Sequence, residues 1–233
     1  EPSGCPIFIF CRKIVSHDTQ FEKWNKWLDT IYSDVQGLLV NRYIYQEVQK
    51  VIQANPKIQV ESSFYEWMGY VYATAAVIGV RRQLDKDKSS ISFIRLLEEI
   101  RNKPKIVSRE RYISLYSNSI LPKDFANHDF DTLVGKDRAY IDPQRVGKDI
   151  DLLYKKAEKI KKFVNKRIAH FDKSDFKNLP TNAELDGCLD YLEKLLKKYL
   201  SIFRAEAHIS IVPVWQYDWK QIFKYPWIEK VRQ

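Results

Sequence analysis

The chain has 233 residues, of which 45% are hydrophobic and 30% are charged. This composition supports a hydrophobic core and argues against an intrinsically disordered protein. The 7 glycines and 9 prolines are too few for a turn-rich all-β fold. A net charge of +9 favours an anionic partner, nucleic acid above all, although a solvated lysine-rich surface would give the same value.

Cysteine usage and hydropathy point to a protein of the reducing cytoplasm. Cys5, Cys11 and Cys188 form no CxxC pair, so neither a disulfide framework nor a zinc site is predicted. The apolar run at residues 6–10 lacks a basic leader and a cleavage site, so we expect no signal peptide. The longest apolar run, residues 68–80, is too short to span a bilayer, and no membrane association is expected.

Three helices are predicted in the first half of the chain, over residues 20–53, 63–84 and 91–101. Apolar residues recur in the first two at steps of three and four, which places them on one helix face. The two stripes are Phe21, Trp24, Leu28, Ile31, Val35 and Leu38, and then Phe64, Met68, Val71, Ala75 and Ile78. Asn55-Pro56 marks the stop between these helices.

Two more helices follow an irregular crossover at residues 102–141, in which only short pieces such as 112–116 show regular character. They are expected at residues 143–171 and 182–205, again from their stripes. The stripe residues are Val146, Ile150, Leu153, Ala157, Ile160, Val164 and Ile168, and then Leu185, Leu189, Leu192, Leu196, Leu200 and Phe203. Capping signals support the helix starts. They are Thr19 with Glu22, Ser63 with Glu66, Thr181 with Glu184, and Asp142-Pro143.

The predicted architecture is an all-α, mostly antiparallel helical bundle, a single domain over residues 1–233. It has a long embellished crossover and a Trp-rich C-terminal extension, residues 206–233. Residues 209–215 of the extension are compatible with a short strand. Its tryptophans Trp215, Trp219 and Trp227 need burial, so we expect the extension to wrap back over the helices.

One local cluster has the composition of a chemical site, at the end of the helix predicted for residues 143–171. Lys166 and Arg167 offer positive charge for a phosphate, and His170 can transfer protons near neutral pH. Asp172 follows and can orient the basic groups. The structural alternative is a C-terminal cap, because basic residues stabilise the end of a helix dipole.

A second anomaly lies at Arg82 and Asp85, where the stripe of the second helix should continue with apolar residues. Opposite charges there either pair with each other, reach the end of the 143–171 helix, or lie in solvent where the helix leaves the core. The lysines at 155, 156, 159, 161 and 162 form a solvated face or a track for an RNA backbone that leads to His170.

Motifs for other chemistries are absent from the sequence. There is no nucleotide-binding glycine loop, zinc-protease motif or serine-hydrolase elbow. His17, His128 and His208 have no second ligand at metal spacing. No metal and no cofactor is therefore predicted.

The segment Lys166-Arg167-Ile168-Ala169-His170-Phe171-Asp172 in an all-α bundle resembles the HEPN (higher eukaryote and prokaryote nucleotide-binding) domains, and most closely their abortive-infection U-type (AbiU-like) branch. That branch also carries an Arg-Xaa-Xaa-Asp segment followed by serines and a leucine pair. Here these are Arg82, Asp85, Ser90, Ser92, Leu96 and Leu97. The resemblance covers residues 60–205, which it implies are a HEPN-like core.

The resemblance implies a metal-independent endoribonuclease in which an arginine positions the phosphate and His170 acts in the acid–base step. The family arginine precedes the histidine by a set spacing, and Phe163, Val164 and Asn165 occupy those positions here. A substitute would come from Arg167, Lys166 or Arg82; alternatively catalysis is lost. HEPN domains usually dimerise with two motifs facing one cleft.

The resulting expectation is a cytoplasmic homodimer of prokaryotic defence or toxin–antitoxin type that acts on RNA, with an antitoxin protein as a further partner. The alternative is a catalytically inactive module that binds RNA, a nucleotide or an antitoxin. A third reading is a structural helical protein whose basic surface serves only solubility.

Overall fold

The computed structural model describes residues 7–117, 120, 123–168 and 179–227. The described part is helical, which confirms the all-α class. Its α-helices are α1 (Ile7–Ala54), α2 (Ser63–Gln83), α3 (Phe93–Asn102), α4 (Arg109–Ser114), α5 (Lys123–Val134), α6 (Pro143–Phe163) and α7 (Asn182–Arg204). Within these ranges no strand forms, and an isolated β-bridge joins Ser108 to Tyr140.

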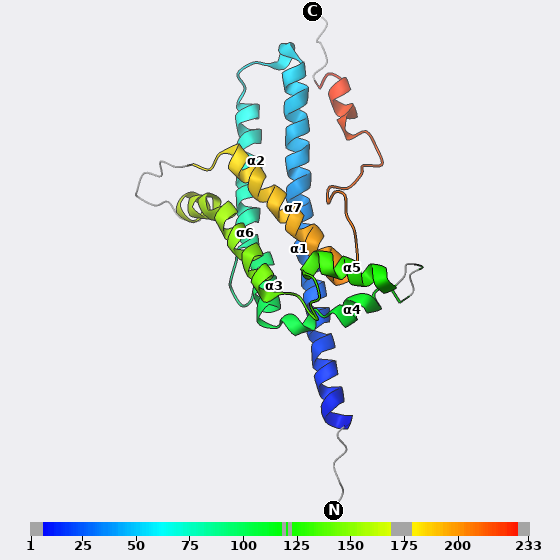
Figure 1. Cartoon of the computed structure of the whole chain (residues 1–233). Helices are drawn as coiled ribbons and strands as arrows, with labels where there is room; N and C mark the ends of the chain where they lie inside the picture. The colour runs from blue at the N-terminus through cyan, green and yellow to red at the C-terminus, as the bar shows by residue number, and fades with distance from the viewer. Residues whose placement is uncertain (1–6, 118–119, 121–122, 169–178, 228–233) are drawn as a thin grey trace, which may run out of the picture.

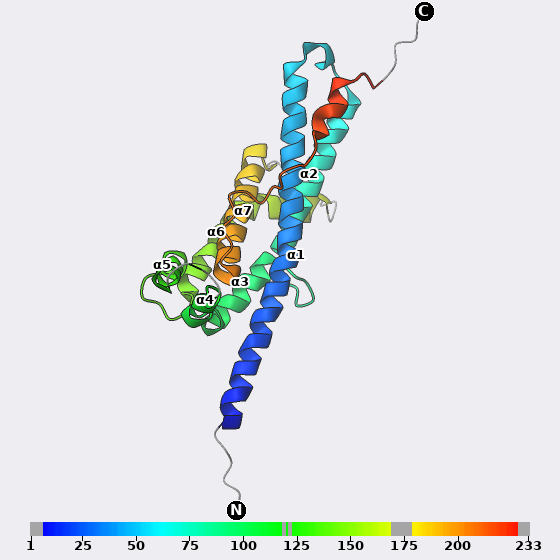
Figure 2. The same ribbon diagram turned by 90° about the vertical axis from the view of Figure 1, so that its right-hand side faces the viewer.

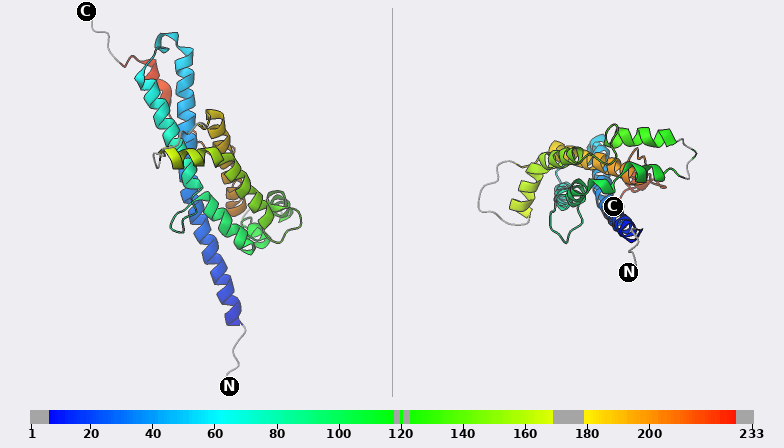
Figure 3. Two further views of the ribbon diagram at one scale, coloured as in Figure 1. Left: turned by 90° about the vertical axis from the view of Figure 1, so that its left-hand side faces the viewer. Right: turned by 60° about the horizontal axis from the view of Figure 1, so that its bottom comes forward.

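Helix α1 is the axis of the molecule, and α2 returns antiparallel beside its C-terminal half (Figures 1 and 2). Helices α6 and α7 run antiparallel to each other and cross this pair obliquely, with α3 beside α6 (Figure 3). The far end of the α1–α2 hairpin projects beyond α6 and α7 (Figure 1). None of the helices in the described ranges is long and apolar enough to cross a membrane.

The predicted stripes of α1, α6 and α7 form the core. Every described member of these stripes is buried, from Phe21 and Trp24 on α1 to Leu200 and Phe203 on α7. Burying apolar side chains along one face of each helix is the main source of bundle stability. The periodicity of these helices therefore identified their buried faces correctly.

The stripe predicted for α2 is wrong, because it faces outward. Phe64, Val71 and Ala75 are exposed, while the buried residues are Ala76, Val77, Gly79, Val80 and Gln83. Helix α2 is apolar on both sides, so its periodicity does not distinguish the core face. A β-carbon at Gly79 would overlap the Leu38 side chain of α1, which shows how closely the two helices approach there.

The capping signals had mixed outcomes. Thr181 and Glu184 form the full capping box, and the Asp142 carboxylate accepts from the Gln144 amide at 2.9 Å. Helix α1 begins at Ile7, so Thr19 lies inside it and is not a cap. The cap of α2 is Ser62, one residue before the predicted Ser63.

The crossover is more regular than predicted, since it contains α4 and α5. Tyr112 and Phe130 are buried between them with their ring centroids 5.3 Å apart. The guanidinium of Arg109 pairs with Asp131 and donates to the Asn127 carbonyl at 3.2 Å. The predicted long loop is therefore a compact helical cap on one end of the bundle (Figure 1).

The C-terminal extension returns along α1, as predicted, but its residues 209–215 are not a strand. Trp215 and Trp219 are partly buried, whereas Trp227 is 66% exposed, so the predicted burial of this tryptophan is wrong. Trp215 stacks on Tyr43 with ring centroids 5.0 Å apart. The Gln36 side chain donates to the Ile211 carbonyl at 2.9 Å, and Lys220 pairs with Glu47. These side-chain contacts hold the extension against α1, in place of the backbone hydrogen bonds that a strand would make.

Candidate functional site

The candidate site lies where the C-terminal end of α2 meets the end of α6. Helix α6 ends at Phe163, and the chain continues as a π-helix over Val164–Ile168. The prediction of one α-helix to residue 171 is thus wrong in this last part. A π-helix has wider turns than an α-helix, so α-helical spacing does not place the side chains of Val164–Ile168.

The π-helix presents Asn165 and Lys166 to solvent, while Val164 is buried and anchors it to the core. Arg167 belongs to the same π-helix by its backbone. His170 and Asp172 lie outside the described residues. Single turns of π-helix occur frequently at functional sites, where they redirect side chains.

Arg81 connects the end of α2 to this turn. Its Nε donates to Asn165 Oδ1 at 3.2 Å, and its Nη1 lies 4.0 Å from Asp85 Oδ1. The Arg81 side chain is 32% exposed, so about two thirds of its surface is covered by neighbouring residues. An arginine from another helix therefore contacts Asn165, the residue that precedes the predicted motif.

Of the alternatives considered for Arg82, pairing with Asp85 and reaching the end of α6 do not occur among the described residues; the side chain is 57% exposed and has a partner on α1. Its guanidinium pairs with Asp34 of α1, and Gln83 Nε2 donates to the same carboxylate at 2.6 Å. The side chain of Gln83 is buried, and its Oε1 accepts from the Phe93 amide at 3.1 Å. Arg82 is thus directed toward α1, and Asp85 pairs with Arg81 instead of Arg82.

Sequence reasoning missed Arg81, although it stands next to Arg82. The stripe argument selected Arg82 because it continued the spacing of an apolar face. That face points outward, and the structure pairs Arg82 with Asp34 of α1 while Arg81 contacts Asn165. The sequence signal that could have identified Arg81 is the Arg81-Arg82 pair itself. Adjacent residues on a helix point in different directions, so the pair presents positive charge on two sides of α2.

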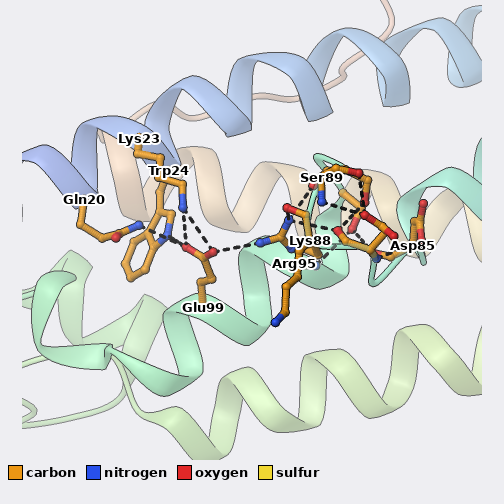
Figure 4. Close-up of polar contacts among 11 residues, drawn as sticks. Gln20, Lys23, Trp24, Asp85, Lys88, Ser89, Arg95 and Glu99 are labelled. Atoms are coloured by element: carbon orange, nitrogen blue, oxygen red, sulfur yellow. Dashed lines mark hydrogen bonds and ion pairs between the residues drawn. The ribbon is translucent and has the colours of Figure 1, made fainter.

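The loop between α2 and α3 holds Asp85 in place. Ser92 Oγ donates to the Asp85 carbonyl at 2.5 Å and accepts from the Arg95 amide at 3.2 Å. The Arg95 guanidinium donates to the carbonyls of Asp87 and Ser90 at 3.0 Å each, and to that of Lys88 (Figure 4). This loop is the serine-containing segment of the resemblance, and here its serines are structural.

Glu99 fixes the other side of Arg95. Its carboxylate accepts from the buried Trp24 indole at 2.6 Å, from Gln20 at 3.1 Å and from Arg95 at 3.2 Å (Figure 4). Burial acts to raise the pKa of Glu99, but the hydrogen bond from Trp24 and the charges of Lys23 and Arg95 outweigh it and hold the pKa below its ordinary value. Glu99 therefore remains ionised and ties α3 to α1.

The outer face of α6 carries a row of lysines that ends at the π-helix. Lys155, Lys156, Lys159 and Lys162 are exposed, followed by Lys166. Lys159 pairs with Glu184 and Lys162 with Glu158, so part of this charge is balanced locally. In the described ranges no group of histidine, cysteine and acidic side chains could hold a metal ion.

The bundle and the basic turn at the end of α6 are those of a HEPN-type helical protein. The model of the HEPN family AbiU2 matches residues 21–218, so the chain belongs to this family. The match is wider than the resemblance predicted, since it includes most of α1 and the first half of the extension. No curated protein and no solved structure matched the chain.

Proposed function

We propose that this chain is an RNA-acting HEPN protein of prokaryotic defence or toxin–antitoxin type, and that it cleaves RNA without a metal ion. The observation that supports this most directly is the hydrogen bond between Arg81 and Asn165. Asn165 is one of the positions where the family arginine is expected. An arginine from α2 touches that position, so the missing guanidinium is supplied from another helix.

The chemistry requires two proton transfers and positive charge on the phosphate. The 2′-oxygen of the ribose bonds to phosphorus while the bond to the 5′-oxygen breaks. One proton leaves the 2′-hydroxyl and another reaches the 5′-oxygen. His170 serves in these transfers, while Lys166, Arg167 and Arg81 stabilise the charge that develops on the phosphate.

Acidic residues would hold these cations in position, with Asp85 acting on Arg81 and Asp172 on the residues of the motif. Arg82 is held by Asp34 and ranks below Arg81 as a phosphate ligand. The lysines on the outer face of α6 would guide the RNA backbone toward the π-helix. A cytoplasmic location and an antitoxin partner complete the proposal.

One observation favours the second candidate, a module that binds RNA, a nucleotide or an antitoxin without cutting. The Arg81 guanidinium already contacts Asn165 and Asp85, so part of its bonding capacity is used within the protein. A phosphate would have to share or displace these contacts. If it cannot, the surface binds anions without accelerating cleavage.

The test is cleavage of a mixed RNA pool in EDTA by the wild-type protein, His170→Ala and His208→Ala. His208 lies on the extension and contacts Glu206, which makes it a matched control for removing an imidazole. We expect cleavage by the wild type and His208→Ala but not by His170→Ala. No cleavage by any protein, with salt-sensitive RNA binding that Lys166→Ala weakens, would establish the binding module instead.

A further inference from the structure

A depression of about 320 Å³ lies between the antiparallel helices α1 and α2 (Figure 2). Its apolar wall includes Gly37 of α1 and Ala75 and Ile78 of α2. The small size of two of these residues leaves the room, and a β-carbon added at Gly37 would meet nothing beyond its own stretch of α1 within 4 Å. The volume is at the lower end of the range for small-molecule sites, so it suits one flat ring system.

Arg82 stands at one end of the depression with its guanidinium held in place. Its Nε donates to Asp34 Oδ2 at 3.4 Å, and its Nη2 donates to the other oxygen of the same carboxylate. Asp34 is in turn fixed by the buried Gln83, whose Nε2 donates to it at 2.6 Å. An arginine that is oriented in advance loses little freedom when it binds a ligand, which favours specific recognition.

The outer edge of the Arg82 guanidinium is available for a ligand. Asp34 takes hydrogen bonds from Nε and Nη2, and the Arg82 side chain is 57% exposed. Within the part of the chain that the structure describes, no group accepts from Nη1. The N–H groups of Nη1 and Nη2 that point away from Asp34 therefore form a fork, which fits two acceptor atoms side by side.

The charge of the depression favours a neutral ligand over a phosphate. Asp34 and Arg82 both line it, and their opposite charges cancel. Two further polar side chains in its lining, Ser33 and Asn41, are uncharged. A phosphate bound to Arg82 would also be repelled by the adjacent carboxylate. The ligand that fits best therefore offers two neutral acceptors on the edge of a flat, mostly apolar body.

We propose that this depression binds a guanine base. The O6 and N7 atoms of guanine are a neutral pair of acceptors on one edge, and an arginine fork is their commonest specific partner in nucleic-acid recognition. Adenine has a donor in place of O6, and the pyrimidines have no N7. The faces of the guanine ring would lie against the apolar side chains of Ala75 and Ile78.

The position of the depression connects it to the candidate site. Arg82 follows Arg81, whose Nε donates to Asn165, and adjacent residues on a helix point about 100° apart. One RNA strand that crosses the end of α2 would thus present a base to Arg82 and a phosphate to Arg81. That the guanine belongs to an RNA rests on the proposed function, whereas the binding of the base itself does not.

The first experiment compares the dissociation constants of four nucleosides, measured by ligand-observed NMR: guanosine, inosine, 7-deazaguanosine and adenosine. Inosine keeps both O6 and N7, 7-deazaguanosine lacks N7, and none of the four carries a phosphate. We expect guanosine and inosine to bind about tenfold more tightly than the other two. Equal affinities for guanosine and adenosine, or no binding of guanosine at millimolar concentration, would overturn the proposal.

Variants test the two parts of the depression separately. Arg82→Ala should abolish the preference for guanosine over adenosine, whereas Arg138→Ala, which removes a similarly exposed arginine paired with Asp142, should keep it. Ala75→Leu fills the depression from an exposed position and should weaken guanosine binding about tenfold. Ala183→Leu makes the same change on the exposed side of α7 and should have no effect. A preference that survives Arg82→Ala, or an affinity that survives Ala75→Leu, would contradict the site.

A third measurement separates the two sources of guanine, an RNA and a free nucleotide. The His170→Ala protein, chosen to prevent cleavage, is titrated with guanosine 5′-monophosphate and with two five-nucleotide RNAs of uracil that carry guanine or adenine at the centre. Tighter binding of the guanine-containing RNA than of both other ligands supports RNA as the source. Equal binding of the two RNAs would overturn RNA as the source. Guanosine binding by a protein that cleaves no RNA would contradict the proposed nuclease and leave the guanine site supported.

Discussion

Arg81 of α2 donates from its Nε to Oδ1 of Asn165 at 3.2 Å, across a sequence separation of 84 residues. The contact joins the end of α2 to the π-helix that follows α6. Asn165 is one of the three positions, with Phe163 and Val164, at which the resemblance implies an arginine, and here it accepts a hydrogen bond from an arginine of another helix. The arginine that contacts the π-helix is therefore Arg81, next in sequence to Arg82, which the apolar spacing had selected.

The first prediction concerns this pair of arginines. We expect Arg81→Ala to lower RNA cleavage on the order of 100-fold, as the loss of a positioned donor to a phosphate does in other enzymes. Arg82→Ala should have a smaller effect, because Asp34 holds that side chain toward α1. Arg138→Ala, which removes an exposed arginine paired with Asp142, serves as the unaffected control. Equal losses at Arg81 and Arg82 would refute the assignment.

The second prediction concerns the stability that Glu99 provides. We expect Glu99→Gln to lower the free energy of unfolding by about 1–2 kcal/mol, because charged hydrogen bonds to Lys23 and Arg95 are lost. Glu158→Gln removes an exposed pair with Lys162 and should cost less than about 0.5 kcal/mol. Urea unfolding at pH 7 measures both. Equal free energies of unfolding for the two variants would contradict the stabilising role of Glu99.

The same residue predicts a pH dependence. The pKa of Glu99 is lower in the folded protein than its ordinary value of 4.5, so the folded state binds this proton less readily. Its contribution to stability is present above the ordinary pKa and is lost as the pH falls through the lowered one. The difference in unfolding free energy between wild type and Glu99→Gln should therefore shrink between pH 5 and pH 3. A constant difference over this range would show that Glu99 stabilises by another route.

The third prediction concerns the close approach of α1 and α2. A methyl group at position 79 would overlap Leu38, so Gly79→Ala should destabilise the protein by about 1–2 kcal/mol despite the better helix propensity of alanine. At Gly147 on α6 the nearest atom is 3.9 Å from an added β-carbon. Gly147→Ala should therefore stabilise by about 0.5–1 kcal/mol. Thermal unfolding of the two variants separates the effect of packing from that of helix propensity. If both substitutions stabilised the protein, the tight contact at Gly79 would be contradicted.

The fourth prediction concerns Cys188, which is fully buried on α7. Burial raises the pKa of its thiol to about 12, only partly offset by the charge of Lys156. Because the thiolate is the reactive form, the native protein should resist alkylation of Cys188 by iodoacetamide at pH 8. Mass spectrometry of the peptide that contains Cys188 should show labelling only after unfolding in urea. Rapid labelling of the native protein would show that α7 is more open than described.

Several parts of the fold could be predicted because they depend on local sequence. The stripes of α1, α6 and α7 have one apolar face each, so their periodicity identified the core. The capping box at Thr181 and the proline after Asn55 are local devices that act in any context. The HEPN resemblance rested on a short contiguous segment, and the family match confirmed it.

By itself the sequence determined the helical class, the family and the buried faces of helices that are polar on one side. Only the tertiary structure decided which side of α2 is buried, because both of its sides are apolar and the choice depends on where α1 approaches Gly79. It also decided that Arg81 contacts Asn165 while Arg82 contacts Asp34. Adjacent residues on a helix point about 100° apart, so only the placement of neighbouring helices can assign a partner to each.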